Sequence, residues 1–95
     1  LGWMENAPKE QTDYAKQFLR LNEQEKYNWG MMKAALASAA DTCILTMQDL
    51  ISLKSDGRMN VPGTAQGNWT WRIADGWAND WLAGILKKYT TIYQR

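Results

Sequence analysis

Hydrophobic side chains recur at helical spacing near the start of the chain. Tyr14, Phe18 and Leu21 stand at steps of four and three residues, and charged residues occupy the opposite face. Pro8 suits the first turn of a helix, where its missing N–H group has no partner to lose. The pattern predicts a helix over residues 8–21.

A second helix is predicted over residues 23–40, directly after the first. Trp29, Met32 and Leu36 lie on one stripe of this segment. Residues 34–40 are slim and alanine-rich, which favours the helix and lets a neighbouring element approach closely. We expect this helix to be well covered on one side.

A third helix is predicted from residue 75 or 76 to about Tyr93. Asp80 near its start and two lysines near its end agree in sign with the helix dipole. Its apolar stripe consists of Trp77, Trp81, Ile85 and Tyr89, with Ile92 three residues further on. Because all three stripes are complete, we expect the three helices to pack on one another.

Residues 42–46, between the second and third helices, form a short apolar and partly β-branched run. Such a run predicts a buried strand, and residues 47–51 predict a short helical turn after it. No other segment offers this strand a pairing partner, although its backbone N–H and C=O groups need one. The residues therefore predict a mainly α fold with one short strand.

Composition and charge exclude several kinds of site. The 95 residues suit one small domain, and 11 basic against 10 acidic side chains leave a net charge of +1. This balance gives no electrostatic reason to expect nucleic acid or an anionic membrane as a partner, and no apolar run is long enough to span a bilayer. With no histidine and one cysteine, a zinc site or a Ser-His-Asp triad within the chain is excluded. Cys43 lies in an apolar run, which suits a reducing, cytoplasmic location.

The carboxylates indicate no acid–base pair. Only Asp49, beside the end of the predicted strand, has a position typical of a functional site. Pairing with Arg58 or capping the following loop is the more common role for such a residue. Because no two carboxylates are arranged convincingly for catalysis, no catalytic residue is expected in this chain.

Residues 57–72 contain glycines, a proline, asparagines and two tryptophans. This is too many turn formers for a helix and too many aromatic rings for an idle linker. Tryptophan is the compositional outlier, with six in the chain. Tryptophans fill small cores, and they also offer flat faces on which sugar rings stack, so both roles stay open.

The stretch MQDLISLKSDGRMNVPGTAQGNWTWR resembles the C-terminal signature of the 4-α-glucanotransferases, also called amylomaltases or disproportionating enzymes. The N-terminal Leu1-Gly2-Trp3 is similar to the end of another family segment, so the resemblance covers nearly the whole chain. Ser52 and Lys54 depart from the pattern, because relatives often have glycine at these turn positions. The matching positions are Met47-Gln48-Asp49-Leu50, Gly57-Arg58-Met59-Asn60, Pro62-Gly63-Thr64, Gly67-Asn68-Trp69, Trp71 and Arg72.

The resemblance implies that residues 1–95 are one unit, the last part of a (β/α)8 barrel. Residues 42–46 would be the eighth strand and the third predicted helix would close the barrel. The family transfers α-1,4-glucan segments between maltooligosaccharides with retention of configuration and without a metal or organic cofactor. Its three catalytic carboxylates precede Leu1, so the resemblance implies that this chain alone is inactive. An unpaired strand would favour self-association of the chain.

The resemblance also assigns the site residues. Residues 58–69 would form the loop after the eighth strand and one wall of the sugar-binding cleft, with Asn60, Pro62 and Gly63 at the substrate. Trp69 and Trp71 are expected to pack beneath the loop. The residues expected to support the loop are Gln48, Asp49, Arg58, Asn68 and Trp69.

Two other classes of function stay open. One is a small carbohydrate-binding module that uses exposed tryptophans. The other is a small helical interaction domain in which the tryptophan cluster is purely structural. Quenching of tryptophan fluorescence by sugar would favour the first, and a cooperative monomer without a sugar response would favour the second.

Overall fold

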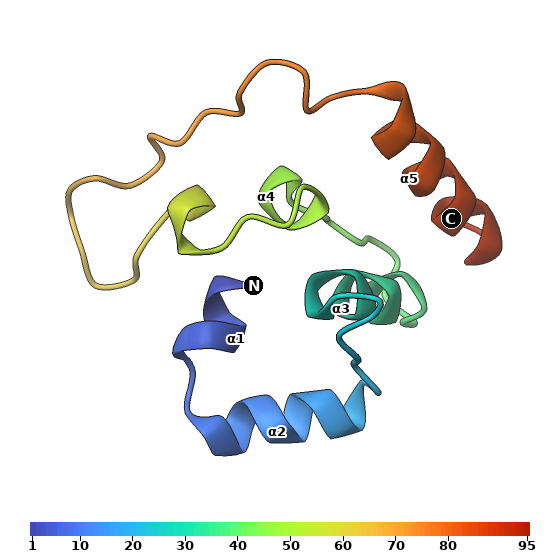
Figure 1. The fold of residues 1–95 in the computed structure, drawn as a ribbon, viewed down its shortest axis with the longest axis horizontal. Coiled ribbons are helices and arrows are strands. Elements are labelled where there is room, and N and C mark those ends of the chain that lie inside the picture. The colour runs from blue at the N-terminus through green and yellow to red at the C-terminus, as the bar shows by residue number, and fades with distance from the viewer.

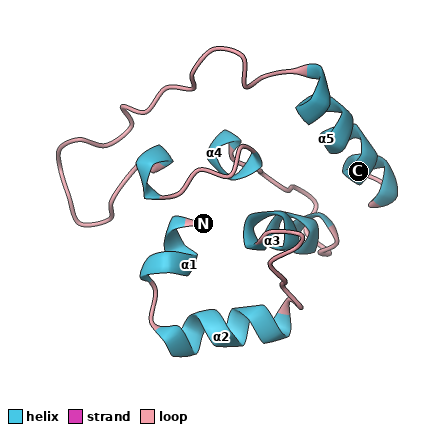
Figure 2. Cartoon of the chain, viewed as in Figure 1, coloured by secondary structure: helices cyan, strands magenta, loops and turns pink.

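A computed structural model describes all residues, 1–95, and shows a mainly helical chain without strands (Figures 1 and 2). None of the helices is both long and apolar enough to cross a membrane. The elements are α1 (Gly2–Asn6), α2 (Lys9–Phe18), α3 (Tyr27–Leu36), α4 (Met47–Leu50), the 3-10 turn η1 (Ser55–Gly57) and α5 (Asp80–Ile92).

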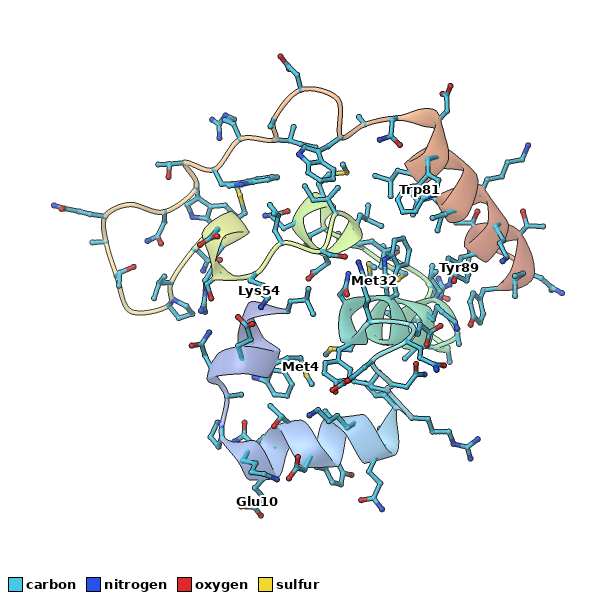
Figure 3. The ribbon with its side chains drawn as sticks, in the orientation of Figure 1. Met4, Glu10, Met32, Lys54, Trp81 and Tyr89 are labelled. Atoms are coloured by element: carbon cyan, nitrogen blue, oxygen red, sulfur yellow. The ribbon has the colours of Figure 1, made fainter.

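The core of the molecule is small and lies where α3, α4 and α5 meet. Each of these helices contributes one side chain to a buried apolar cluster, namely Met32, Leu50 and Leu82. Figure 3 shows Met32 pointing from α3 toward the other two helices. Partly buried side chains packed against these three are Trp29, Leu45, Met47, Ile51 and Leu86. The core therefore holds α3, α4 and α5 together and leaves α2 outside it.

Helix α2 forms where the sequence predicts it, but its aromatic stripe is not covered. Tyr14 and Phe18 are 66% and 71% exposed and stack on each other with ring centroids 5.8 Å apart. The buried side chain of α2 is Thr12, which lies two residues, or about 200° around the helix, from Tyr14. The prediction that all three apolar stripes pack on one another is wrong for α2.

Helix α3 is shorter than predicted at both ends. Lys26 has a φ of 69°, in the left-handed region, so the helix starts only at Tyr27. The last turn ends at Leu36, and Arg95 contacts the chain at and beyond this end. The Arg95 guanidinium donates hydrogen bonds to the carbonyls of Leu36, Ser38 and Ala40, at 2.6–3.0 Å. These contacts satisfy carbonyls that the end of a helix leaves free.

Residues 42–46 form no strand, which corrects the prediction of a buried one. The segment has no regular structure, and Ile44 is 84% exposed whereas Cys43 and Leu45 are only partly covered. The physical reason is the one already visible in the sequence: the chain contains no second strand to pair with it. Within these 95 residues, apolar composition therefore does not suffice to bury the segment.

Helix α5 begins at Asp80, about four residues later than predicted. The Asn79 side chain caps it, since its Oδ1 accepts a hydrogen bond from the Leu82 N–H at 2.9 Å. Trp77 therefore precedes the helix and cannot continue its stripe. Residues 58–79 run as one long irregular segment that arcs over α4 to reach α5 (Figure 1).

Candidate functional site

The segment from Met59 to Trp69 closes on itself. The Trp69 N–H donates to the Met59 carbonyl, which brings the two ends together. Compact loops of this length with adjacent ends are a recurrent carrier of function. Figure 1 shows the loop projecting away from the helices. We call residues 59–69 the closed loop.

Asn68 holds the inside of the closed loop. Its Oδ1 accepts from the Val61 N–H at 2.8 Å, and its Nδ2 donates to the Thr64 carbonyl at 3.0 Å. The Thr64 hydroxyl in turn donates to the Val61 carbonyl at 2.7 Å. The Asn68 amide thus supplies hydrogen bonds to the backbone that a helix or hairpin would form between its own backbone groups. This arrangement gives the loop a defined shape without regular secondary structure.

The tip of the closed loop is a type II turn at Pro62 and Gly63. The turn pairs the Thr64 N–H with the Val61 carbonyl at 3.2 Å, and Gly63 has a φ of 81°. A type II turn favours proline at its second position and needs a residue that tolerates positive φ at its third. Proline and glycine at these positions therefore determine the shape of the tip.

Asn60 lies exposed near the start of the closed loop. Its backbone carbonyl accepts from the Arg58 Nε at 2.8 Å, which fixes the backbone on one side. The Asn60 residue is exposed, and its side-chain amide makes no hydrogen bond within the chain. An amide offers both donors and an acceptor, so Asn60 can donate a hydrogen bond to a hydroxyl group or accept one from it.

The side chains of the closed loop carry no charge. Residues 59–69 include no acidic or basic side chain. The loop can therefore supply hydrogen bonds and shape to an uncharged ligand, but it cannot donate or accept a proton as a catalyst would.

Asp49 and Arg58 do not form the pair that the sequence suggested as one possibility. The Thr46 hydroxyl donates to Asp49 Oδ2 at 2.8 Å and accepts from the Asp49 N–H at 3.3 Å, so both residues close the first turn of α4. Asp49 Oδ1 also lies 3.5 Å from the Leu1 nitrogen. Arg58 turns instead toward Asn60. The Asp49 carboxylate is thus bonded within the first turn of α4 rather than to Arg58.

Gln48 lies beneath the start of the loop, against Gly57. A Cβ at Gly57 would come within 3.0 Å of Gln48 Cγ and 2.9 Å of Leu53 Cδ1. A larger residue would crowd these side chains, and Gly57 is buried there. Gln48 and Leu53 therefore set the position from which the chain enters Arg58 and the loop.

The tryptophans after the loop differ from the expectation that both pack beneath it. Trp69 is 65% exposed and has a φ of 61°, an uncommon conformation for a bulky residue. Trp71 is partly buried. The backbone of Trp69 supports the loop through its bond to Met59, whereas its indole ring is left free.

Asn28 and Ser52 are two residues that the sequence analysis did not assign to the support of the site. Asn28 is 3% exposed, and its Nδ2 donates to the Asp49 carbonyl at 2.6 Å and to the Ser52 Oγ at 3.0 Å. Ser52 has a φ of 60°, so the turn keeps the backbone that suits the glycine often found in relatives. In the sequence, the replacement of the common glycine by Ser52 was the feature that could have drawn attention to this turn. Nothing in the sequence marked Asn28.

Known proteins similar to this chain agree with the resemblance seen in its motifs. A family model described as 4-alpha-glucanotransferase matches residues 1–78. The 4-alpha-glucanotransferase of Clostridium butyricum is 38% identical over 95 residues, and that of Synechocystis sp. is 37% identical over 95 residues. These alignments cover 99% and 100% of this chain but 20% and 19% of the relatives.

A solved structure is similar as well. The chain superposes on an amylomaltase from Streptococcus agalactiae, solved in complex with acarbose, with a TM-score of 0.88 and 37% identity. The match covers 99% of this chain and 19% of that one. The chain thus spans about a fifth of the length of its relatives. From the match to the family model and these similarities, the chain belongs to the 4-alpha-glucanotransferase family.

Proposed function

We propose that this chain is the C-terminal part of a retaining 4-α-glucanotransferase and that the closed loop forms one wall of its glucan-binding cleft. The observation that carries the proposal is the closed loop itself, which is preformed, uncharged and equipped with the free amide of Asn60. A neutral polyhydroxylated substrate needs hydrogen bonds and shape rather than charge. The acarbose bound by the related amylomaltase supports a glucan-like ligand.

In this proposal the chain binds and orients the glucan, and other parts of the enzyme carry out the chemistry. Retaining transfer uses a carboxylate nucleophile and an acid–base carboxyl group about 5–5.5 Å apart. The nucleophile forms a covalent glucosyl-enzyme, and a hydroxyl of the acceptor sugar then displaces it. Asn60 would hydrogen-bond a sugar hydroxyl, while Pro62 and Gly63 shape the wall. Gln48, Asp49, Arg58, Asn68 and the backbone of Trp69 keep that wall in place. No metal or organic cofactor takes part.

The placement within a (β/α)8 barrel is part of the same proposal. Residues 42–46 would be the eighth strand, whose partners belong to the rest of the barrel, and α5 would be the closing helix. The exposure of Ile44 supports this, because a barrel strand needs neighbours on both edges. Active sites of such barrels lie on the loops after the strands, where the closed loop follows α4. The single free cysteine supports a cytoplasmic enzyme.

Disproportionation of maltotriose tests the proposed activity. The full-length protein that carries this segment should convert maltotriose into glucose and longer maltooligosaccharides, which chromatography with pulsed amperometric detection resolves. The purified 95-residue chain should produce neither, because it lacks the carboxylate pair that the reaction needs. Transfer by the 95-residue chain, or none by the full-length protein, would overturn the proposal.

A further inference from the structure

Helix α1 packs on the turn that precedes the closed loop. A Cβ at Gly2 would lie 2.9 Å from the Ser55 Oγ and 3.2 and 3.3 Å from the Ser55 N and Cα. Two of these three atoms belong to the backbone, so rotation of the Ser55 side chain could not relieve all of the contacts. The Asn6 Nδ2 donates to the Gly2 carbonyl at 2.7 Å and to the Ser55 Oγ at 3.2 Å. We call Gly2, Asn6 and Ser55 the α1 joint.

An ion pair lies beside the α1 joint. The Lys54 ammonium donates a hydrogen bond to the Glu5 carboxylate, which raises the pKa of Lys54 above its usual range. Figure 3 shows Lys54 next to α1. Lys54 stands where relatives often have glycine, so this chain makes a side-chain contact there that a glycine could not make. Both partners are largely exposed, and such pairs contribute little. The packing and hydrogen bonds of the α1 joint are therefore the main contact between α1 and the turn.

Two backbone contacts connect the α1 joint to Asn60. The Arg58 N–H donates to the Ser55 carbonyl at 3.1 Å, and the Arg58 Nε donates to the Asn60 carbonyl at 2.8 Å. Ser55 thus holds the residue that in turn fixes the backbone of Asn60. On the other side of the same turn, Asn28 holds Ser52. The turn before the closed loop is therefore anchored both to α1 and to α3.

We propose that Gly2 and Asn6 are positioning residues for the closed loop. Acting through Ser55 and Arg58, they set the place at which Asn60 meets the glucan. This inference rests on the proposed function, which assigns the glucan to the closed loop. The hydrogen bonds inside the loop involve no residue of the α1 joint. A displaced turn would therefore move the loop as a body and carry Asn60 away from its ligand.

Steady-state kinetics of maltotriose disproportionation by the full-length protein test the inference. Gly2→Ala and Asn6→Ala should each raise KM about fivefold and leave kcat within about twofold, because a wall that binds substrate and transition state alike changes KM alone. A loss of folded protein would instead lower the apparent kcat and leave KM unchanged. Gln17→Ala, at an exposed position on α2, should keep the wild-type KM and kcat.

A double variant shows whether the α1 joint acts through Asn60. Residues that act through one contact are not additive, so Asn6→Ala should raise KM no further when it is added to Asn60→Ala. An unchanged KM in both single variants, a loss confined to kcat, or a full additional loss in the double variant would overturn the inference. These outcomes are distinct from wild-type kinetics for Asn60→Ala alone, which would contradict the proposed function itself.

Discussion

Ser52 adopts a backbone conformation that suits glycine, and a buried asparagine holds it there. At a φ of 60° a residue with a Cβ is disfavoured by about 1–2 kcal/mol. The hydrogen bond from Asn28 Nδ2 to Ser52 Oγ offsets part of this cost, and the same amide donates to the Asp49 carbonyl. The side chain of Asn28 thus links α3 both to α4 and to the turn after it. The entrance to the closed loop depends on the same contacts.

Replacement of Asn28 by alanine should therefore destabilise the protein by about 1–3 kcal/mol, since it removes two hydrogen bonds worth about 0.5–1.5 kcal/mol each. Thermal denaturation followed by circular dichroism measures the effect. Gln17→Ala is the control, because Gln17 is exposed on α2 and such positions change stability by less than about 0.5 kcal/mol. An Asn28→Ala variant that melts together with the control would show that this contact is dispensable.

The three longer helices could be predicted from the sequence far better than their ends or the strand, whereas the short α1 was not predicted. Spacing within a helix is local, and α2, α3 and α5 all lie within their predicted ranges. The ends depend on contacts from elsewhere: Arg95 reaches Leu36 across 59 positions. Residues 42–46 were read as a strand because apolarity alone predicts burial, whereas a strand requires a partner.

In the closed loop, too, local features can be predicted from the sequence and contacts between separated residues cannot. The turn at Pro62 and Gly63 can be predicted from its residue types. The Asn68 side chain forms hydrogen bonds with residues up to seven positions away. No periodic pattern in the sequence predicts such bonds. The resemblance to the family named Asn68 as a support of the loop, but only the structure shows how it acts. The amide of Asn28 was missed altogether, because nothing in a single sequence marks a buried donor.

At the scale of the whole molecule, the chain exposes apolar side chains that a barrel would cover. Ile44 is 84% exposed and lies in the segment without regular structure, and Tyr14 and Phe18 are open on α2. Such segments pair readily with another molecule. Because the core of α3, α4 and α5 is small, few contacts within the chain cover these side chains in place of a second molecule.

We therefore expect the isolated 95-residue chain to self-associate. Sedimentation velocity at several concentrations should show a weight-average mass that rises above the 10.9 kDa of the monomer. Ile44→Lys should weaken the association, since it places a charge on the exposed segment, whereas Gln17→Lys should leave it unchanged. A strictly monomeric chain at every concentration would mean that these residues are self-sufficient.

The central claim about the whole enzyme is that the closed loop binds the glucan through Asn60. The most direct measurement is kcat/KM for maltotriose disproportionation by the full-length protein and its Asn60→Ala variant. We expect a loss of about tenfold or more with the fold intact, since a good polar contact in a desolvated site is worth about 1–3 kcal/mol. Gln17→Ala should retain the wild-type value. Wild-type kinetics for Asn60→Ala would contradict the assignment of the closed loop as a wall of the binding cleft.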